Sequence, residues 1–315
     1  MSSFKSRVYS ILTTLTGLFG PWFFGIVARG IAAGYYIGCP RRVAVSVRFY
    51  RALFPDRSRA YYLWCAWRQF QNFTSVFLDR YMMQHPRGVH FTIEGREHLV
   101  RAVAQQNGGI LLMSHIGNWE VGARLLRRNV PDVRLMLYMG QRAKDQIERL
   151  QKQDLTADGI RIVAVDQDGG SPLDLLEAVA FLRSGGVVSL AGDRVWRPDQ
   201  RVVPVRFLGH TVQLPEAPHM LAMASGAPLF FFFAASKGPR QYQFAVSPPV
   251  WVKAADRHRR REAIVQSAQA YADQMVHQLH RCPFEWYHFE SFLGPPDGAH
   301  DPGGKVGGDP PRCRG

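Results

Sequence analysis

Strand-like and helix-like segments alternate along most of this chain, and this order limits the folds that it can adopt. The run 109–114 is short and wholly apolar apart from its ends, which is typical of a strand covered on both faces. Similar runs predict strands at 89–94, 133–138, 159–165, 186–191, 228–234 and 242–246, and helical patterns lie at 97–105, 119–128, 142–153, 172–182 and 259–279. We therefore predict an α/β fold, with a mainly parallel central sheet flanked by helices on both faces.

The N-terminal region carries a long stretch without charge. No charged residue occurs from Val8 to Ala28, and about 20 apolar residues are needed to cross a bilayer. We expect a membrane anchor within residues 1–42, either one span or a helix that is kinked at Pro21 and lies in the interface. A buried core helix is the alternative. A cleaved signal peptide is less favoured, because the apolar part is long for its hydrophobic region.

The rest of the chain predicts one large domain and a tail. Residues 49–83 are rich in aromatic side chains at helical spacing, which indicates either core packing or a surface for a membrane or an acyl chain. We assign residues 43–293 to the α/β domain. Residues 295–315 contain six glycines and five prolines, so we expect the segment 294–315 to be disordered.

The balance of charge restricts the partners of this protein. Lys and Arg number 39 against 25 Asp and Glu, for a net charge of +14. This excess favours anionic partners, namely nucleic acid, anionic lipid head groups or an acidic carrier protein. The four cysteines show no paired spacing, so the sequence suggests neither a zinc site nor a disulfide framework.

The segment 114–120, Ser-His-Ile-Gly-Asn-Trp-Glu, is the sharpest candidate for a reactive site. His115 stands where a strand should end, and Glu120 falls in the first turn of the next helix, where the positive end of the helix dipole favours a carboxylate. Across such a turn Glu120 could hold one ring nitrogen of His115 and leave the other free to accept a proton from a hydroxyl. Gly117 would allow the sharp turn and leave room for a substrate.

This histidine-four-residues-acid pattern resembles that of the lysophospholipid acyltransferase superfamily, and the form His-Ile-Gly-Asn-Trp-Glu is close to that of the bacterial lipid A biosynthesis (lauroyl or myristoyl) acyltransferases. Three further blocks are similar to that family: the Gly-Asp-Arg at 192–194, the stretch 205–218, and the aromatic segment 283–289. Together they cover roughly residues 20–293. Glu216 departs from the family, which usually has glycine there, and this puts the role of that position in doubt.

The resemblance implies a membrane-associated O-acyltransferase on the cytoplasmic face of a bacterial inner membrane. The donor would be an acyl thioester on acyl carrier protein or coenzyme A, and no other cofactor or metal is expected. The acceptor would be a hydroxyl of a lipid A-like lipid, a glycolipid or a lysophospholipid. His115 and Glu120 would be catalytic, and the substrate-binding residues would be Gly117, Asn118, Trp119, Arg142, Asp193 and Arg194.

Other functions are less well supported by the sequence. A zinc hydrolase would need a second histidine near His115, and no His-Glu-x-x-His occurs. A serine hydrolase would need a Gly-x-Ser-x-Gly turn around Ser114, which is also missing. The charge leaves open a basic protein that binds nucleic acid or lipid without catalysis, although no standard nucleic-acid-binding motif occurs and we expect no nucleic acid partner.

Overall fold

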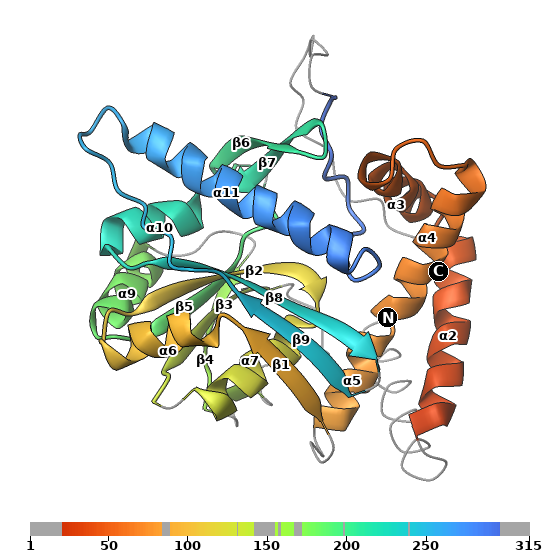
Figure 1. Cartoon of the computed structure of the whole chain (residues 1–315), viewed down its shortest axis with the longest axis horizontal. Helices are drawn as coiled ribbons and strands as arrows, with labels where there is room; N and C mark the ends of the chain where they lie inside the picture. The colour runs from red at the N-terminus through yellow and green to blue at the C-terminus, as the bar shows by residue number, and fades with distance from the viewer. Residues whose placement is uncertain are drawn as a thin grey trace.

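The computed structural model describes residues 21–83, 89–130, 132–141, 155–156, 159–166, 172–197, 199–238 and 240–296. At its centre is a seven-stranded sheet with the strand order β1-β9-β8-β2-β5-β3-β4 (Figure 1). The strands are β1 (His90–Glu94), β2 (Gly109–Gly117), β3 (Leu135–Gln141), β4 (Arg161–Asp166), β5 (Val187–Ala191), β8 (Leu229–Gly238) and β9 (Gln241–Val246). All neighbours pair in parallel except β8 and β9. The predicted α/β fold with a mainly parallel sheet is confirmed.

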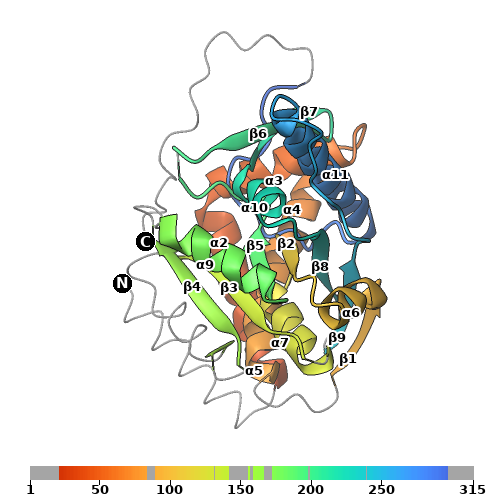
Figure 2. The ribbon, with the colours of Figure 1, turned by 90° about the vertical axis from the view of Figure 1, so that its left-hand side faces the viewer.

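Helices cover both faces of this sheet (Figure 2). The helices of the α/β domain are α6 (Arg96–Ala104), α7 (Trp119–Asn129), α9 (Pro172–Arg183), α10 (Ala217–Ser225) and α11 (Arg260–Arg281). Successive residues of β2 point to opposite sides, so Leu112 belongs to the core shared with α9, α10 and α11. Leu111 belongs to the core shared with α6 and α7. The predicted helix at 142–153 lies outside the described residues.

A second sheet, which the sequence did not predict as strands, lies against α11. It is the antiparallel hairpin of β6 (Val202–Phe207) and β7 (His210–Pro215). Val203, Val205 and Phe207 alternate with exposed residues and enter the core beneath α11. Because Pro204 interrupts the pattern, and proline is tolerated only on edge strands, the alternation was not sufficient to indicate a strand.

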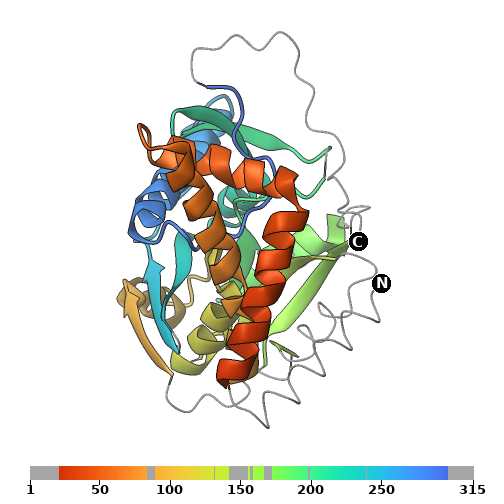
Figure 3. The same ribbon diagram turned by 90° about the vertical axis from the view of Figure 1, so that its right-hand side faces the viewer.

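The N-terminal part forms a group of helices beside the sheet (Figure 3). These are α2 (Pro21–Gly38), α3 (Pro40–Leu53), α4 (Arg59–Phe73) and α5 (Ser75–Met83). The aromatic segment 49–83 is helical as predicted, but it is divided near Pro55 and Thr74. The uncharged stretch from Val8 is described only from Pro21 onward.

The geometry of α2 and α3 bears on the expected anchor. Within the described residues no single helix meets the length and hydropathy of a membrane span, but the pair 22–38 and 40–53 does so together, with a bend of 91°. Large apolar side chains on α2 are exposed: Trp22 by 64%, Ile26 by 57% and Ile37 by 78%. α2 therefore presents the apolar surface expected of a membrane-associated helix.

Candidate active site

The site lies at the carboxyl end of β2, the strand that pairs with both β5 and β8 in the middle of the sheet. In open α/β sheets this end gathers ligand-binding groups. β2 extends three residues beyond the prediction, so His115 lies within the strand, two residues before its end. Gly117 follows with φ +73°, and a Cβ there would lie 1.7 Å from the Ala234 carbonyl oxygen, so only glycine allows β2 to end this close to β8.

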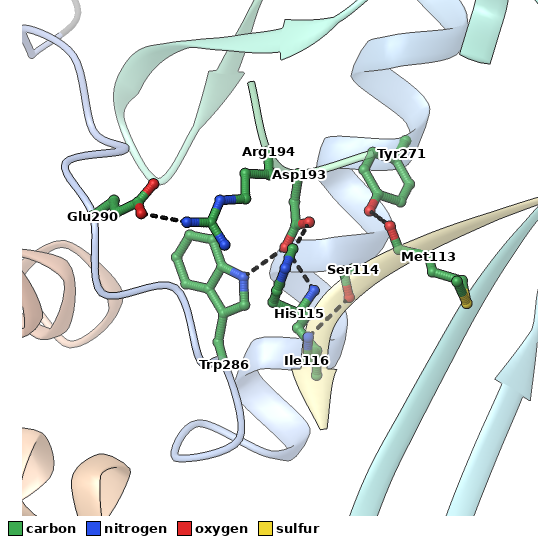
Figure 4. A network of polar contacts seen from close by, with 9 residues as sticks. All are labelled: Met113, Ser114, His115, Ile116, Asp193, Arg194, Tyr271, Trp286 and Glu290. Atoms are coloured by element: carbon green, nitrogen blue, oxygen red, sulfur yellow. Dashed lines mark hydrogen bonds and ion pairs between the residues drawn. The ribbon is translucent and has the colours of Figure 1, made fainter. Parts of the chain in front are cut away.

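His115 is held by Asp193, which follows the neighbouring strand β5 (Figure 4). The ring Nδ1 lies 2.8 Å from Asp193 Oδ1, and the His115 backbone N–H donates to Asp193 Oδ2 at 2.7 Å. Trp286 Nε1 donates to the same Oδ2 at 2.9 Å. Asp193 is thus fixed by three donors, and its position sets that of the imidazole ring.

The electrostatics of this pair keep Asp193 ionised. Burial alone would raise the pKa of Asp193, but the charge and hydrogen bonds of His115 hold that pKa below its ordinary value. The ionised Asp193 carboxylate accepts a hydrogen bond from Nδ1–H, so Nε2 is the ring nitrogen that can take up a proton from a substrate. Nε2 has no hydrogen-bond partner among the described residues, and the His115 side chain is 21% exposed, so a substrate hydroxyl can reach it.

The expected contact between His115 and Glu120 must be corrected. Glu120 lies in the first turn of α7 as predicted, but its Oε1 accepts from Arg124 Nη2 at 3.2 Å, one helical turn along, and both side chains are buried. Among the described residues the carboxylate that contacts the His115 ring is Asp193 instead. Because β2 continues through Gly117, His115 remains in the sheet beside β5 rather than in a turn above α7.

Three of the other predicted substrate-binding residues, Asn118, Trp119 and Arg194, make contacts with the rest of the protein. Asn118 is the N-cap of α7, accepting from the Val121 N–H, and it also donates to the buried Asp79 at 3.2 Å. Trp119 packs against the core on the α7 side of the sheet. Arg194 pairs with Glu290 and lies 4.6 Å from the Trp196 ring. Arg142 lies outside the described residues.

Two residues of the site were not predicted individually, although both belong to the aromatic segment 283–289. Trp286 holds Asp193, and the His288 ring stacks on Trp286 with centroids 5.2 Å apart. The signal in the sequence was the resemblance of the segment 283–289 to a block of the acyltransferase family, and this resemblance gave no role to either residue. No pattern of spacing could join a segment near residue 286 to a histidine at position 115.

A second group of buried carboxyl groups lies beside this site. Asp79 accepts from Asn118 and Tyr242, and Glu285 accepts from Asn72 and Tyr287. Burial raises the pKa of Asp79, and it raises that of Glu285 to about 7. Both carboxyl groups line a cavity of about 1040 Å³ between α2, α4, α5 and the segment 281–285. No cluster of three or more His, Cys, Asp or Glu side chains suited to a metal occurs in the described part of the chain.

Comparison with known proteins identifies a family. The family model described as "Bacterial lipid A biosynthesis acyltransferase" matches residues 67–291, well over half of the chain. No curated protein matches the chain significantly. The matched segment includes Asp193 and the two residues that contact its carboxylate, His115 and Trp286 (Figure 4).

Proposed function

This chain belongs to the bacterial lipid A biosynthesis acyltransferase family, and we propose that it moves a fatty acyl group from an acyl thioester to a hydroxyl of a membrane lipid, with His115 as the general base. The acceptor classes are a lipid A-like lipid, a glycolipid or a lysophospholipid. The observation that carries this proposal is the contact between His115 and the ionised Asp193, which leaves one imidazole nitrogen free and accessible.

The reaction follows from that geometry. Nε2 of His115 takes the proton of the lipid hydroxyl while the hydroxyl oxygen attacks the thioester carbonyl carbon. The new C–O bond forms, the carbonyl electrons move onto oxygen, and Asp193 stabilises the resulting imidazolium. When the C–S bond breaks, the leaving thiolate receives the proton from His115, so the enzyme returns to its starting state without an acyl-enzyme intermediate.

The residues predicted from the motif have distinct proposed roles. We assign Asp193 to hold His115, and Arg194 to the substrate because it follows Asp193 at the strand end. Gly117 supplies space beside the ring. Glu120 stabilises the start of α7 through Arg124, and a direct catalytic role for it remains a prediction from the motif.

The exposed apolar side chains of α2 and the positive net charge support an enzyme that acts at a membrane surface. The exposed apolar face of α2 would lie in the interface as part of the anchor 1–42, with the domain 43–293 on the cytoplasmic side of the inner membrane. The charge of +14 supports binding to anionic lipid and to an anionic acyl donor, either an acidic acyl carrier protein or coenzyme A. Four exposed arginines just before and at the start of α11 are candidates for this contact: Arg257, Arg259, Arg260 and Arg261.

The test is acyl transfer from radiolabelled acyl carrier protein to lipid by purified protein in detergent. The variant His115→Ala should lower transfer by about 10⁴-fold, the upper range for loss of a general base, and leave a slow residual rate. It should keep the thermal unfolding temperature of the wild type. A matched control is His98→Ala, which removes another partly exposed histidine on α6 and should leave transfer intact. Wild-type turnover by His115→Ala would contradict the role of His115 as the base. If the wild type itself transfers no acyl group, a basic lipid-binding protein without catalysis would be favoured instead.

A further inference from the structure

A second histidine, His288, lies beside His115. The segment that carries it runs antiparallel to the end of β2, since the Gly117 N–H donates to the Glu285 carbonyl at 2.7 Å and the Tyr287 N–H donates to the His115 carbonyl at 2.9 Å. These bonds place the His288 ring with its centroid 6.2 Å from that of His115 and nearly perpendicular to it, at 85°. The two imidazoles therefore lie in the same site.

The imidazole ring of His288 packs against aromatic side chains, but one of its nitrogen atoms lacks a hydrogen-bond partner among the described residues. One face stacks on Trp286, and Phe292 approaches with centroids 5.1 Å apart. The Nδ1 atom is buried and has no hydrogen-bond partner among the described residues. A buried polar atom without a partner costs about 1–3 kcal/mol, so its persistence in a site calls for a ligand that completes it.

The space beside His288 is open to such a ligand. The ring lines a cavity of about 210 Å³ together with Phe49, Trp286, Glu290 and Phe292. Most of the lining side chains are apolar, and Arg48, Glu290 and Ser291 are the other polar ones, so the cavity suits an acyl group with its carbonyl.

The charge state of His288 is also defined. The charged and titratable groups around it are Asp193, His115, Arg194 and Glu290, and burial lowers the pKa of His288 to about 4. The ring is therefore neutral at physiological pH and carries one N–H. A neutral imidazole can donate that N–H to a carbonyl oxygen without competing with the base for the substrate proton.

We propose that His288 is a further catalytic residue, which donates its N–H to the acyl carbonyl oxygen as this oxygen becomes an oxyanion. The inference rests on the proposed function, since it requires a thioester carbonyl that reaches His288 while the attacking hydroxyl contacts His115. The hydrogen bond strengthens as the lipid oxygen bonds to the carbonyl carbon and weakens when the C–S bond breaks. His288 keeps its proton throughout, and the transferred proton passes only through His115.

Two substitutions separate donation from packing. His288→Phe keeps a ring on Trp286 but removes the N–H, and it should lower kcat by about 10²–10³-fold, the range for loss of one oxyanion donor. The KM for the acyl donor and the unfolding temperature should stay near wild type. His288→Asn retains an N–H and should recover at least about tenfold of the lost kcat. The control His280→Phe alters a histidine that contacts only Phe54 among the described rings, and it should be fully active.

Each outcome decides the proposal. Wild-type kcat in His288→Phe would overturn it, and so would a folded His288→Asn that is no more active than His288→Phe. If neither variant folds, His288 is a packing residue and the proposal is wrong. His115→Ala is measured in parallel: full activity there would overturn the proposed function itself, whereas a strongly impaired His115→Ala beside a fully active His288→Phe would overturn the role of His288 alone.

Discussion

Two groups of buried carboxylates flank the end of β2, and they differ in what they contact. Asp193 accepts from His115 and Trp286, and its pKa is held below its ordinary value. Asp79 and Glu285 accept from amide and phenol groups, and burial raises the pKa of both. A carboxylate next to an imidazole stays charged and can stabilise the proton that the imidazole takes up. A carboxylate among neutral donors serves the fold instead.

The largest effect is expected on the Asp193 side of this comparison. Asp193→Asn should lower kcat by about 10³–10⁴-fold, because an amide cannot hold the His115 tautomer or balance its imidazolium. The exposed Asp199, which pairs with Arg197, provides the control Asp199→Asn. Steady-state acyl transfer measures both variants. A loss of less than tenfold in Asp193→Asn would remove the distinction between the two groups of carboxylates.

The next effect concerns Glu120, the acid of the sequence motif. Glu120→Gln removes the negative charge that faces the buried Arg124, and breaking a buried ion pair costs about 3–5 kcal/mol. We expect a lower free energy of unfolding, measured with urea in detergent, and a smaller loss of kcat per folded molecule than in Asp193→Asn. Wild-type stability with a loss of orders of magnitude in rate would return the orienting role to Glu120.

The pH dependence of stability tests the Glu285 side. Its pKa is raised from 4.5 to about 7 in the folded protein, so the folded state binds more protons than the unfolded state between these values. The contribution of Glu285 to the free energy of unfolding should therefore fall by up to about 3 kcal/mol as the pH rises from 4.5 to 7. In Glu285→Gln this contribution should vanish, which urea unfolding at pH 5 and pH 8 would detect. If the free energy of unfolding changes with pH in the same way in the wild type and in Glu285→Gln, the raised pKa of Glu285 is contradicted.

The smallest effect is expected at Asn118. Asn118→Ala removes the N-cap of α7 and should cost about 1 kcal/mol of stability. Because its side chain bonds to Asp79 and to the Val121 N–H, transfer kinetics should change by no more than a few-fold. A large rise in the KM for the lipid acceptor, at unchanged stability, would instead support the substrate-binding role that the motif suggested.

The parts of the molecule that local sequence predicts differ in kind from those that it does not. The strand before His115 and the capped helix after it were predicted, because apolar runs and N-caps act over a few residues. The pairing of His115 with Asp193 was not, although both residues were singled out, because it depends on β5 lying beside β2 in the sheet. Trp286 joins them from a segment more than 90 positions further along the chain than Asp193. Only the three-dimensional arrangement shows that the nearest acid in sequence is not the one in contact.

The most direct test of the account is a double-mutant cycle on acyl transfer by the wild type, His115→Ala, Asp193→Asn and the double variant. If Asp193 acts through His115, Asp193→Asn should cause no further loss in the His115→Ala background, since residues that act as a unit are not additive. Losses that multiply in the double variant would show that the two residues act independently, and would contradict the account.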